Sequence, residues 1–318
     1  AGLDRPTVVC MGVGMTGPPH LGTVGQILTG IELQRTGFDV QFVLADLEPY
    51  HHGADLGRVR ALAERYRAFA LELGFDPERG VLRTQGEARD VMHTAELLAP
   101  YYRPAEREDG DADDGDEEPH GPTAWSRAVG DLYEGGSGSG DRGVDADRDE
   151  RVPMDGPASE AASVHSAVLH GADFLHPLYA QEYEQVVIAL GIDEHGLTPR
   201  TRRFREAAPV SGPVAGLHTR MVPGFWETPK MSKSVGAGIS LDAAPERIRE
   251  RFAAADDGGD PAASPTFAAM CLASRYDAER LHRLEAACEG DGAAWVRARR
   301  EYTEYVVDLA ERWRETAR

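Results

Sequence analysis

The sequence predicts an α/β fold built on a doubly wound parallel sheet, with a small helical domain at its C-terminal end. Three observations predict it. Short buried-strand patterns alternate with amphipathic helix patterns between residues 7 and 84. The strand patterns are apolar runs, as expected for parallel strands that are covered on both faces. From residue 265 to residue 317 only helical periodicity remains.

The first half of the chain supplies three strands and two helices. The expected elements are a strand over 7–14, a helix within 17–37, a strand over 39–50, a helix over 56–74 and a strand over 80–84. Gly37 and Gly74 suit the ends of the two helices, and Asp55 suits the start of the second. In the strand over 39–50, polar side chains appear only at the C-terminal end, at Asp46 and Glu48. Ligands are therefore expected beyond the carboxyl ends of these strands.

The second half resumes the pattern after an interruption. The expected elements are a helix over 162–176, a strand over 185–196, a helix from 199 capped by Thr198, a helix within 241–255, and two or three helices over 265–317. The predicted division is an α/β domain over 1–103 and 161–245, an insertion over 104–160, and a helical domain over 246–318.

The insertion has an unusual composition. Nine of the thirteen residues from Glu106 to Glu118 are acidic, and a Gly/Ser-rich run follows. So little apolar surface cannot offset the entropy of ordering, so we expect a disordered segment, in which only residues 124–133 could form a short helix.

The overall charge does not exclude an anionic partner. The chain has 54 acidic residues and a formal net charge of −20. An acidic, Arg-rich composition of this kind is typical of proteins from salt-loving organisms, in which the acidity reflects the solvent. At molar salt the Debye length is about 3 Å, so global repulsion from a nucleic acid would be weak.

The cysteines and the apolar runs indicate a cytoplasmic protein. Cys10, Cys271 and Cys288 are an odd number without metal-ligand spacing, which predicts buried thiols rather than disulfides or a zinc site. No apolar run is long enough to span a membrane, and no metal-ligating residues are predicted.

Two short motifs carry the predicted chemistry. The loop over 16–23, TGPPHLGT, joins the first strand to the first helix, where helix N–H groups and His20 can bind a phosphate. The second motif, KMSKS, contains Lys230 and Lys233, and every other one of the 34 basic side chains is Arg. A lysine ammonium group on a flexible side chain can follow a moving phosphate, whereas the guanidinium of arginine is a rigid planar group. A need for two such mobile charges explains why lysine is kept at these two positions.

Together, PPHLGT and KMSKS resemble the two signature sequences of class I aminoacyl-tRNA synthetases. The segments QRTGFDVQFVLADLEPY, LELGFDP, GIDEH and LDAAPERIRERF are similar to the archaeal-type tryptophanyl and tyrosyl branch. The resemblance covers roughly residues 7–102 and 162–255.

The resemblance implies roles for individual residues, with ATP and Mg²⁺ as cofactors and tRNA and an amino acid as partners. Catalysis would fall to His20, Lys230 and Lys233. ATP would contact Gly17, His20, Gly22, Thr23, Asp193, Met231, Ser232 and Ser234. The amino acid would contact Cys10, His170, Asp173 and Glu194. The same resemblance implies that the α/β domain is catalytic, that the helical domain over 246–318 is similar to an anticodon-binding domain, and that the protein is a homodimer.

Departures from the family pattern favour tryptophan over tyrosine. Cys10, Ser166 and His170 stand where a tyrosine pocket has hydrogen-bonding groups, and only Asp173 is retained. Glu194 stands where Gln is usual. The segment HTRMVPGFWETPKMSKS also resembles the tryptophanyl branch.

The leading hypothesis is therefore a tryptophan–tRNA ligase. One alternative is a synthetase paralogue that activates tyrosine or another amino acid, transfers it elsewhere, or acts as a regulator. A third, an unrelated nucleotidyltransferase with the same His/Gly loop, is disfavoured by the complete KMSKS match.

Overall fold

A computed structural model describes residues 5–103, 159–222, 224, 238–255, 258–290 and 292–317. The predicted insertion, apart from its last two residues, and its expected short helix lie outside these ranges, as does the KMSKS segment.

A parallel sheet of five strands forms the centre of the described fold, in the order β3-β2-β1-β4-β5. The strands are β1 (Thr7–Gly14), β2 (Asp39–Ala45), β3 (Gly80–Thr84), β4 (Gln185–Gly191) and β5 (Val214–Thr219). All four pairings are parallel. This confirms the predicted doubly wound sheet, in which the strand order reverses between β1 and β4 and a crevice is expected at the carboxyl ends.

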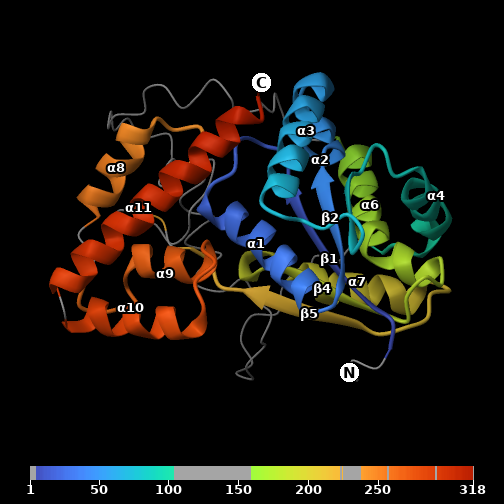
Figure 1. Ribbon diagram of the computed structural model, residues 1–318. Helices are drawn as coiled ribbons and strands as arrows, with labels where there is room; N and C mark the ends of the chain where they lie inside the picture. The colour runs from blue at the N-terminus through green and yellow to red at the C-terminus, as the bar shows by residue number, and fades with distance from the viewer. Residues whose placement is uncertain are drawn as a thin grey trace, which may run out of the picture.

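Helices cover both faces of the sheet (Figure 1). They are α1 (Leu21–Arg35), α2 (Leu47–His51), α3 (Leu56–Glu72), α4 (Arg89–Leu98), α6 (Glu160–Tyr179) and α7 (Leu197–Ala207), with 3₁₀ turns η1 (Ala99–Tyr101) and η2 (Ile192–Glu194). Alternate side chains of β1 enter two separate cores. Val9 and Met11 pack with α1 and α3, and Val8 and Cys10 pack with α4, α6 and α7.

The C-terminal helices extend the first of these cores. They are α8 (Pro245–Ala254), α9 (Pro265–Leu272), α10 (Ala278–Gly290) and α11 (Gly292–Glu315). Figure 1 shows them gathered beside α1, away from α4 and α6. On α11, Trp313 is fully buried, with its ring 5.1 Å from that of Tyr66 and 5.6 Å from that of Phe69, both on α3. The helical segment therefore shares a continuous hydrophobic core with the sheet's α1/α3 layer.

Several predicted helix boundaries are confirmed. The side chain of Asp55 accepts a hydrogen bond from Arg58 N at 2.8 Å and caps α3. Gly37 and Gly74 follow α1 and α3 with φ of 104° and 97°, the left-handed region that glycine enters without strain. The interval 265–317 contains three helices, as expected.

Other predicted boundaries are wrong. The strand expected over 39–50 ends at Ala45, and the strand expected over 185–196 ends at Gly191, because the polar residues that follow each strand turn into α2 and η2. Thr198 does not cap α7, which begins one residue earlier behind Gly196. Helix α4 and strand β5 were not predicted.

Candidate active site

A pocket opens at the carboxyl edge of the sheet, where the doubly wound fold predicts it. Its empty space, which includes solvent at the open mouth, is about 400 Å³. The lining residues come from the ends of β1, β2 and β4 and from the neighbouring helices: Met11, Gly12, Val13, Gly14, Val43, Ala45, Glu48, His170, Asp173, Phe174, Leu190, Glu194 and Leu197. The walls therefore combine nine apolar or glycine residues with three carboxylates and one imidazole.

The His/Gly loop forms the start of α1, as predicted. His20 is the N-cap residue, with φ −104° and ψ 174°, and its Nδ1 accepts a hydrogen bond from Thr23 N at 3.3 Å. A neutral ring that accepts at Nδ1 carries its proton on Nε2, which makes Nε2–H a donor. At Gly22 a Cβ atom would lie 2.9 Å from the His20 ring, so only glycine admits the ring in this position.

Two contacts fix this loop. The hydroxyl of the buried Tyr66 donates to Gly17 O at 2.9 Å. On the other side, Leu241 N donates to Pro19 O at 2.9 Å, and His20 forms an isolated antiparallel bridge with Ser240. The backbone that follows the KMSKS segment is therefore joined to the loop that carries His20.

The lysine motif itself is not described. The sequence-predicted residues that lie outside the described ranges are Lys230, Met231, Ser232, Lys233 and Ser234. Val222 precedes the motif and Ile239 follows it, and both side chains are buried in the same hydrophobic core.

The acidic pair after β4 divides between two surroundings. Both Asp193 and Glu194 are exposed on η2. Glu194 lines the pocket. Asp193 is not among the lining residues, and its Oδ1 lies 2.5 Å from the position that a Cβ atom on Gly191 would take.

Helix α6 brings three sequence-predicted residues to one face at the spacing i, i+4 and i+7. Ser166 and Asp173 are buried, whereas His170 is half-buried. The Nε2 atom of His170 lies 3.8 Å from Glu48 Oε2 on α2. Of these three, His170 and Asp173 line the pocket and Ser166 does not.

Asp173 is held by neighbouring side chains. Its Oδ1 accepts from Arg83 Nη2 at 2.8 Å, and its Oδ2 accepts from Gln85 Nε2 at 2.8 Å. Gln41 Nε2 donates to its backbone carbonyl at 2.7 Å. Arg83 and Asp173 are only 7% and 2% exposed, so this is a buried ion pair between β3 and α6.

Cys10 lies behind the pocket rather than on its wall. It is fully buried, 3.8 Å from Gln41 Nε2, and is not among the lining residues. Burial, more than the opposing effects of Arg83 and Asp173, raises the pKa of its thiol to about 12. Cys10 therefore stays a neutral thiol at physiological pH.

Sequence reasoning overlooked three residues of this site. Glu48 was noted only as a polar strand end, although it lines the pocket. Arg83 and Gln85 were not considered. An arginine inside a short apolar strand was the available signal, because buried arginines require a partner.

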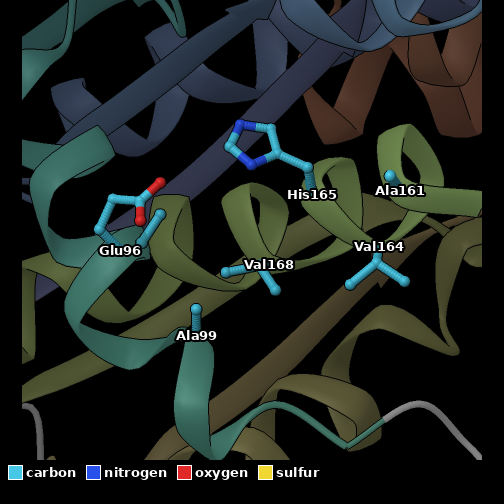
Figure 2. A pocket seen from close by; sticks show the side chains of 7 residues that line it. Glu96, Ala99, Ala161, Val164, His165 and Val168 are labelled. Carbon is cyan, nitrogen blue, oxygen red and sulfur yellow. The ribbon is translucent and has the colours of Figure 1, made fainter.

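A second cavity lies between α4 and α6, apart from the sheet edge (Figure 2). Its lining is mostly apolar: Ala95, Glu96, Ala99, Ala161, Val164, His165 and Val168. Within the described ranges no group of His, Cys, Asp and Glu could hold a metal ion. None of the described helices is long and apolar enough to cross a membrane.

Comparison with known proteins finds one family model that matches the N-terminal third of the chain. Residues 3–103 match the family model of class I tRNA synthetases (W and Y), whose members are aminoacyl-tRNA ligases. No curated protein matches the chain significantly.

Solved structures share the fold over nearly the whole chain. Tryptophanyl-tRNA synthetase from Aeropyrum pernix K1 is 18% identical with a TM-score of 0.70, covering 98% of this chain and 79% of that one. Tyrosyl-tRNA synthetase from Archaeoglobus fulgidus, complexed with L-tyrosine, is 18% identical with a TM-score of 0.66, covering 98% and 90%. Tryptophanyl-tRNA synthetase from Campylobacter jejuni, complexed with ADP and tryptophan, is 17% identical with a TM-score of 0.62, covering 98% and 88%.

Proposed function

Since residues 3–103 match the family of class I tRNA synthetases for tryptophan and tyrosine, we propose that the protein is an ATP-dependent aminoacyl-tRNA ligase and that its amino acid is tryptophan. The observation that carries the proposal is the capped His/Gly loop beside a pocket at the sheet's carboxyl edge. The complete KMSKS motif supports it from the sequence.

The residues fit an ATP site at the start of α1. The first N–H groups of this 15-residue helix and the helix dipole favour an anion. His20 would donate to a phosphate, Gly17, Gly22 and Thr23 would line the approach, and Asp193 would bind the ribose. Mg²⁺ bound together with the phosphates would neutralise part of their charge. The described residues include no group of His, Cys, Asp and Glu that could hold the ion by themselves.

Activation needs positioning and charge stabilisation rather than a covalent residue. The ammonium group of the amino acid substrate would lie near the pocket carboxylates Glu48 and Glu194. The carboxylate of the same substrate would attack the α-phosphorus of ATP in line. Lys230 and Lys233, with Met231, Ser232 and Ser234 beside them, would stabilise the charge that develops on the leaving pyrophosphate. The terminal adenosine of tRNA would then take the aminoacyl group from the adenylate.

Tryptophan is favoured because the pocket offers few partners for a phenol. Cys10 is behind the wall, His170 faces Glu48, and both oxygens of Asp173 already accept hydrogen bonds. A site that recognises a hydroxyl does so through paired polar groups, and without them shape and apolar contact decide.

The test is ATP–pyrophosphate exchange in high salt with each aromatic amino acid, followed by charging of total tRNA. We expect tryptophan to stimulate exchange at least about tenfold better than tyrosine, as the loss of paired hydroxyl contacts implies. The Lys233→Ala variant serves as the control with impaired chemistry. Exchange with tyrosine equal to that with tryptophan would refute the assignment of tryptophan.

A second candidate is a paralogue that activates an amino acid for another acceptor or acts as a regulator. The altered positions Ser166, His170 and Glu194 favour it. Exchange without tRNA charging would support this candidate, and a homodimer, expected by resemblance, is tested by light scattering.

A further inference from the structure

The buried ion pair between Arg83 and Asp173 bears on substrate choice. Asp173 is the one deeply buried charged side chain among the described residues that line the pocket. A buried carboxylate at that position would be the obvious acceptor for a donor on the substrate. The groups that already bond to Asp173 therefore decide whether its carboxylate can accept a hydrogen bond from the substrate.

Three contacts fix Asp173 from the two neighbouring strands β2 and β3. Arg83 on β3 and Gln85 just beyond β3 each donate to one carboxylate oxygen at 2.8 Å, and Gln41 on β2 donates to the backbone carbonyl. The Gln85 amide must present Nε2 to Asp173, because the reverse orientation would oppose two acceptors. The carboxylate is therefore held in one orientation and its charge is matched by a guanidinium.

Arg83 is also placed to act on the pocket wall. In the β2–β3 ladder it is the partner of Val43, which lines the pocket. Its side chain reaches the α6 face of the sheet, as Gln41 does on the neighbouring strand. The arginine thus joins the strand edge beside the pocket to the helix that supplies Asp173.

We propose that Arg83 is a positioning residue that determines specificity: by holding Asp173 it withholds this carboxylate from the substrate, so the pocket selects an aromatic side chain by shape and rejects a phenol. A phenol brings a donor and two acceptor lone pairs that lose water on binding, whereas an indole brings one N–H. The inference rests on the proposed amino-acid activation and names how its substrate is chosen.

The test compares three variants in ATP–pyrophosphate exchange, with kcat and KM measured for tryptophan and for tyrosine. Arg83→Met removes the charge at similar length and releases Asp173. Arg79→Met is the matched control, since it makes the same change at an exposed arginine that donates to Gly37 O and does not line the pocket. The double variant Arg83→Met with Asp173→Asn leaves no buried charge and replaces the single variant if that one fails to fold. Without Arg83, its amide oxygen at position 173 can accept from a phenol in place of the carboxylate.

We expect Arg83→Met and the double variant to raise the tyrosine-to-tryptophan ratio of kcat/KM about tenfold, mostly through a lower KM for tyrosine. Arg79→Met should keep the ratio within about threefold of the parent protein. An unchanged ratio in both Arg83 variants would overturn the inference. A rise of similar size in Arg79→Met would also overturn it, because the effect would then not depend on the release of Asp173.

Calorimetric binding of tryptophan and tyrosine to the same proteins separates this inference from the proposed function. Binding without exchange in the parent protein would refute the ligase activity, while the ratio of binding constants would still report on Arg83. Absence of both binding and exchange would refute both.

Discussion

The His20 side chain combines two roles that one substitution pair can separate. In the structure its Nδ1 caps α1 by accepting from Thr23 N, and in the proposed mechanism its Nε2–H donates to an ATP phosphate. Asn is among the best N-cap residues, so His20→Asn should keep the cap but lacks a ring that reaches the phosphate. His20→Ala removes both.

The expected magnitudes differ between the two readouts. The capping hydrogen bond is 3.3 Å long and half-buried, so His20→Ala should lower the free energy of unfolding by about 0.5–1 kcal/mol, the lower part of the usual range for caps. His20→Asn should leave it nearly unchanged. Loss of one donor that stabilises developing charge costs roughly 3 kcal/mol of activation, or about a hundredfold in rate, and both variants should show it.

The assays are urea unfolding and tryptophan-dependent pyrophosphate exchange, both at the same high salt concentration. If His20→Asn exchanges pyrophosphate at nearly the parental rate, His20 is only a cap and the assignment to phosphate binding is refuted. If the two variants are equally destabilised, the capping geometry is not what stabilises this end of α1.

Two further predictions concern buried side chains. Trp313→Ala should lower the free energy of unfolding by about 3–5 kcal/mol because it leaves a cavity against Tyr66 and Phe69, as urea unfolding will measure. Trp313→Phe should lower the free energy of unfolding much less, since the indole N–H has no hydrogen-bond partner among the described residues. Equal losses of stability in the two variants would contradict this prediction. Burial raises the pKa of the Cys10 thiol from 9.0 to about 12. Between pH 9 and pH 12 only the unfolded chain loses this proton, so the free energy of unfolding should be unaffected below pH 9 and should fall above it. Cys10→Ala should flatten that fall in unfolding curves recorded across alkaline pH, and an unaltered slope would show that other groups cause it.

The sheet was predictable because its central strands are continuous apolar runs. The ends of these strands could not be predicted, since a polar residue after a strand can either extend it or begin a turn. Asp46 shows the difficulty: it is fully buried and accepts from Gly86 N, a contact that depends on the next strand lying alongside. Strand β5 was missed because its pattern is half exposed, whereas α4 carried a detectable signal in Val91, Ala95 and Leu98 at helical spacing.

The candidate site divides in the same way. The His/Gly loop could be predicted because its function depends on neighbours in sequence at a helix start. The pairing of Arg83 with Asp173 joins residues 90 positions apart, and it follows from the strand order and the register of β2 and β3. No local pattern encodes that register, so the partner of Asp173 could not be named from sequence.

The position of β1 in the strand order also has a consequence for biosynthesis. β1 lies between β2, which follows it directly, and β4, whose Gln185 bonds to Thr7 across a separation of 178 residues. At ribosomal rates of roughly 5–20 residues per second, that separation corresponds to about 10–35 s. For this interval one edge of this apolar strand has no native neighbour, and unpaired apolar edges associate between chains. We therefore expect the yield of native protein in a foreign host to depend on translation speed and chaperone supply more than on the stability of the finished sheet.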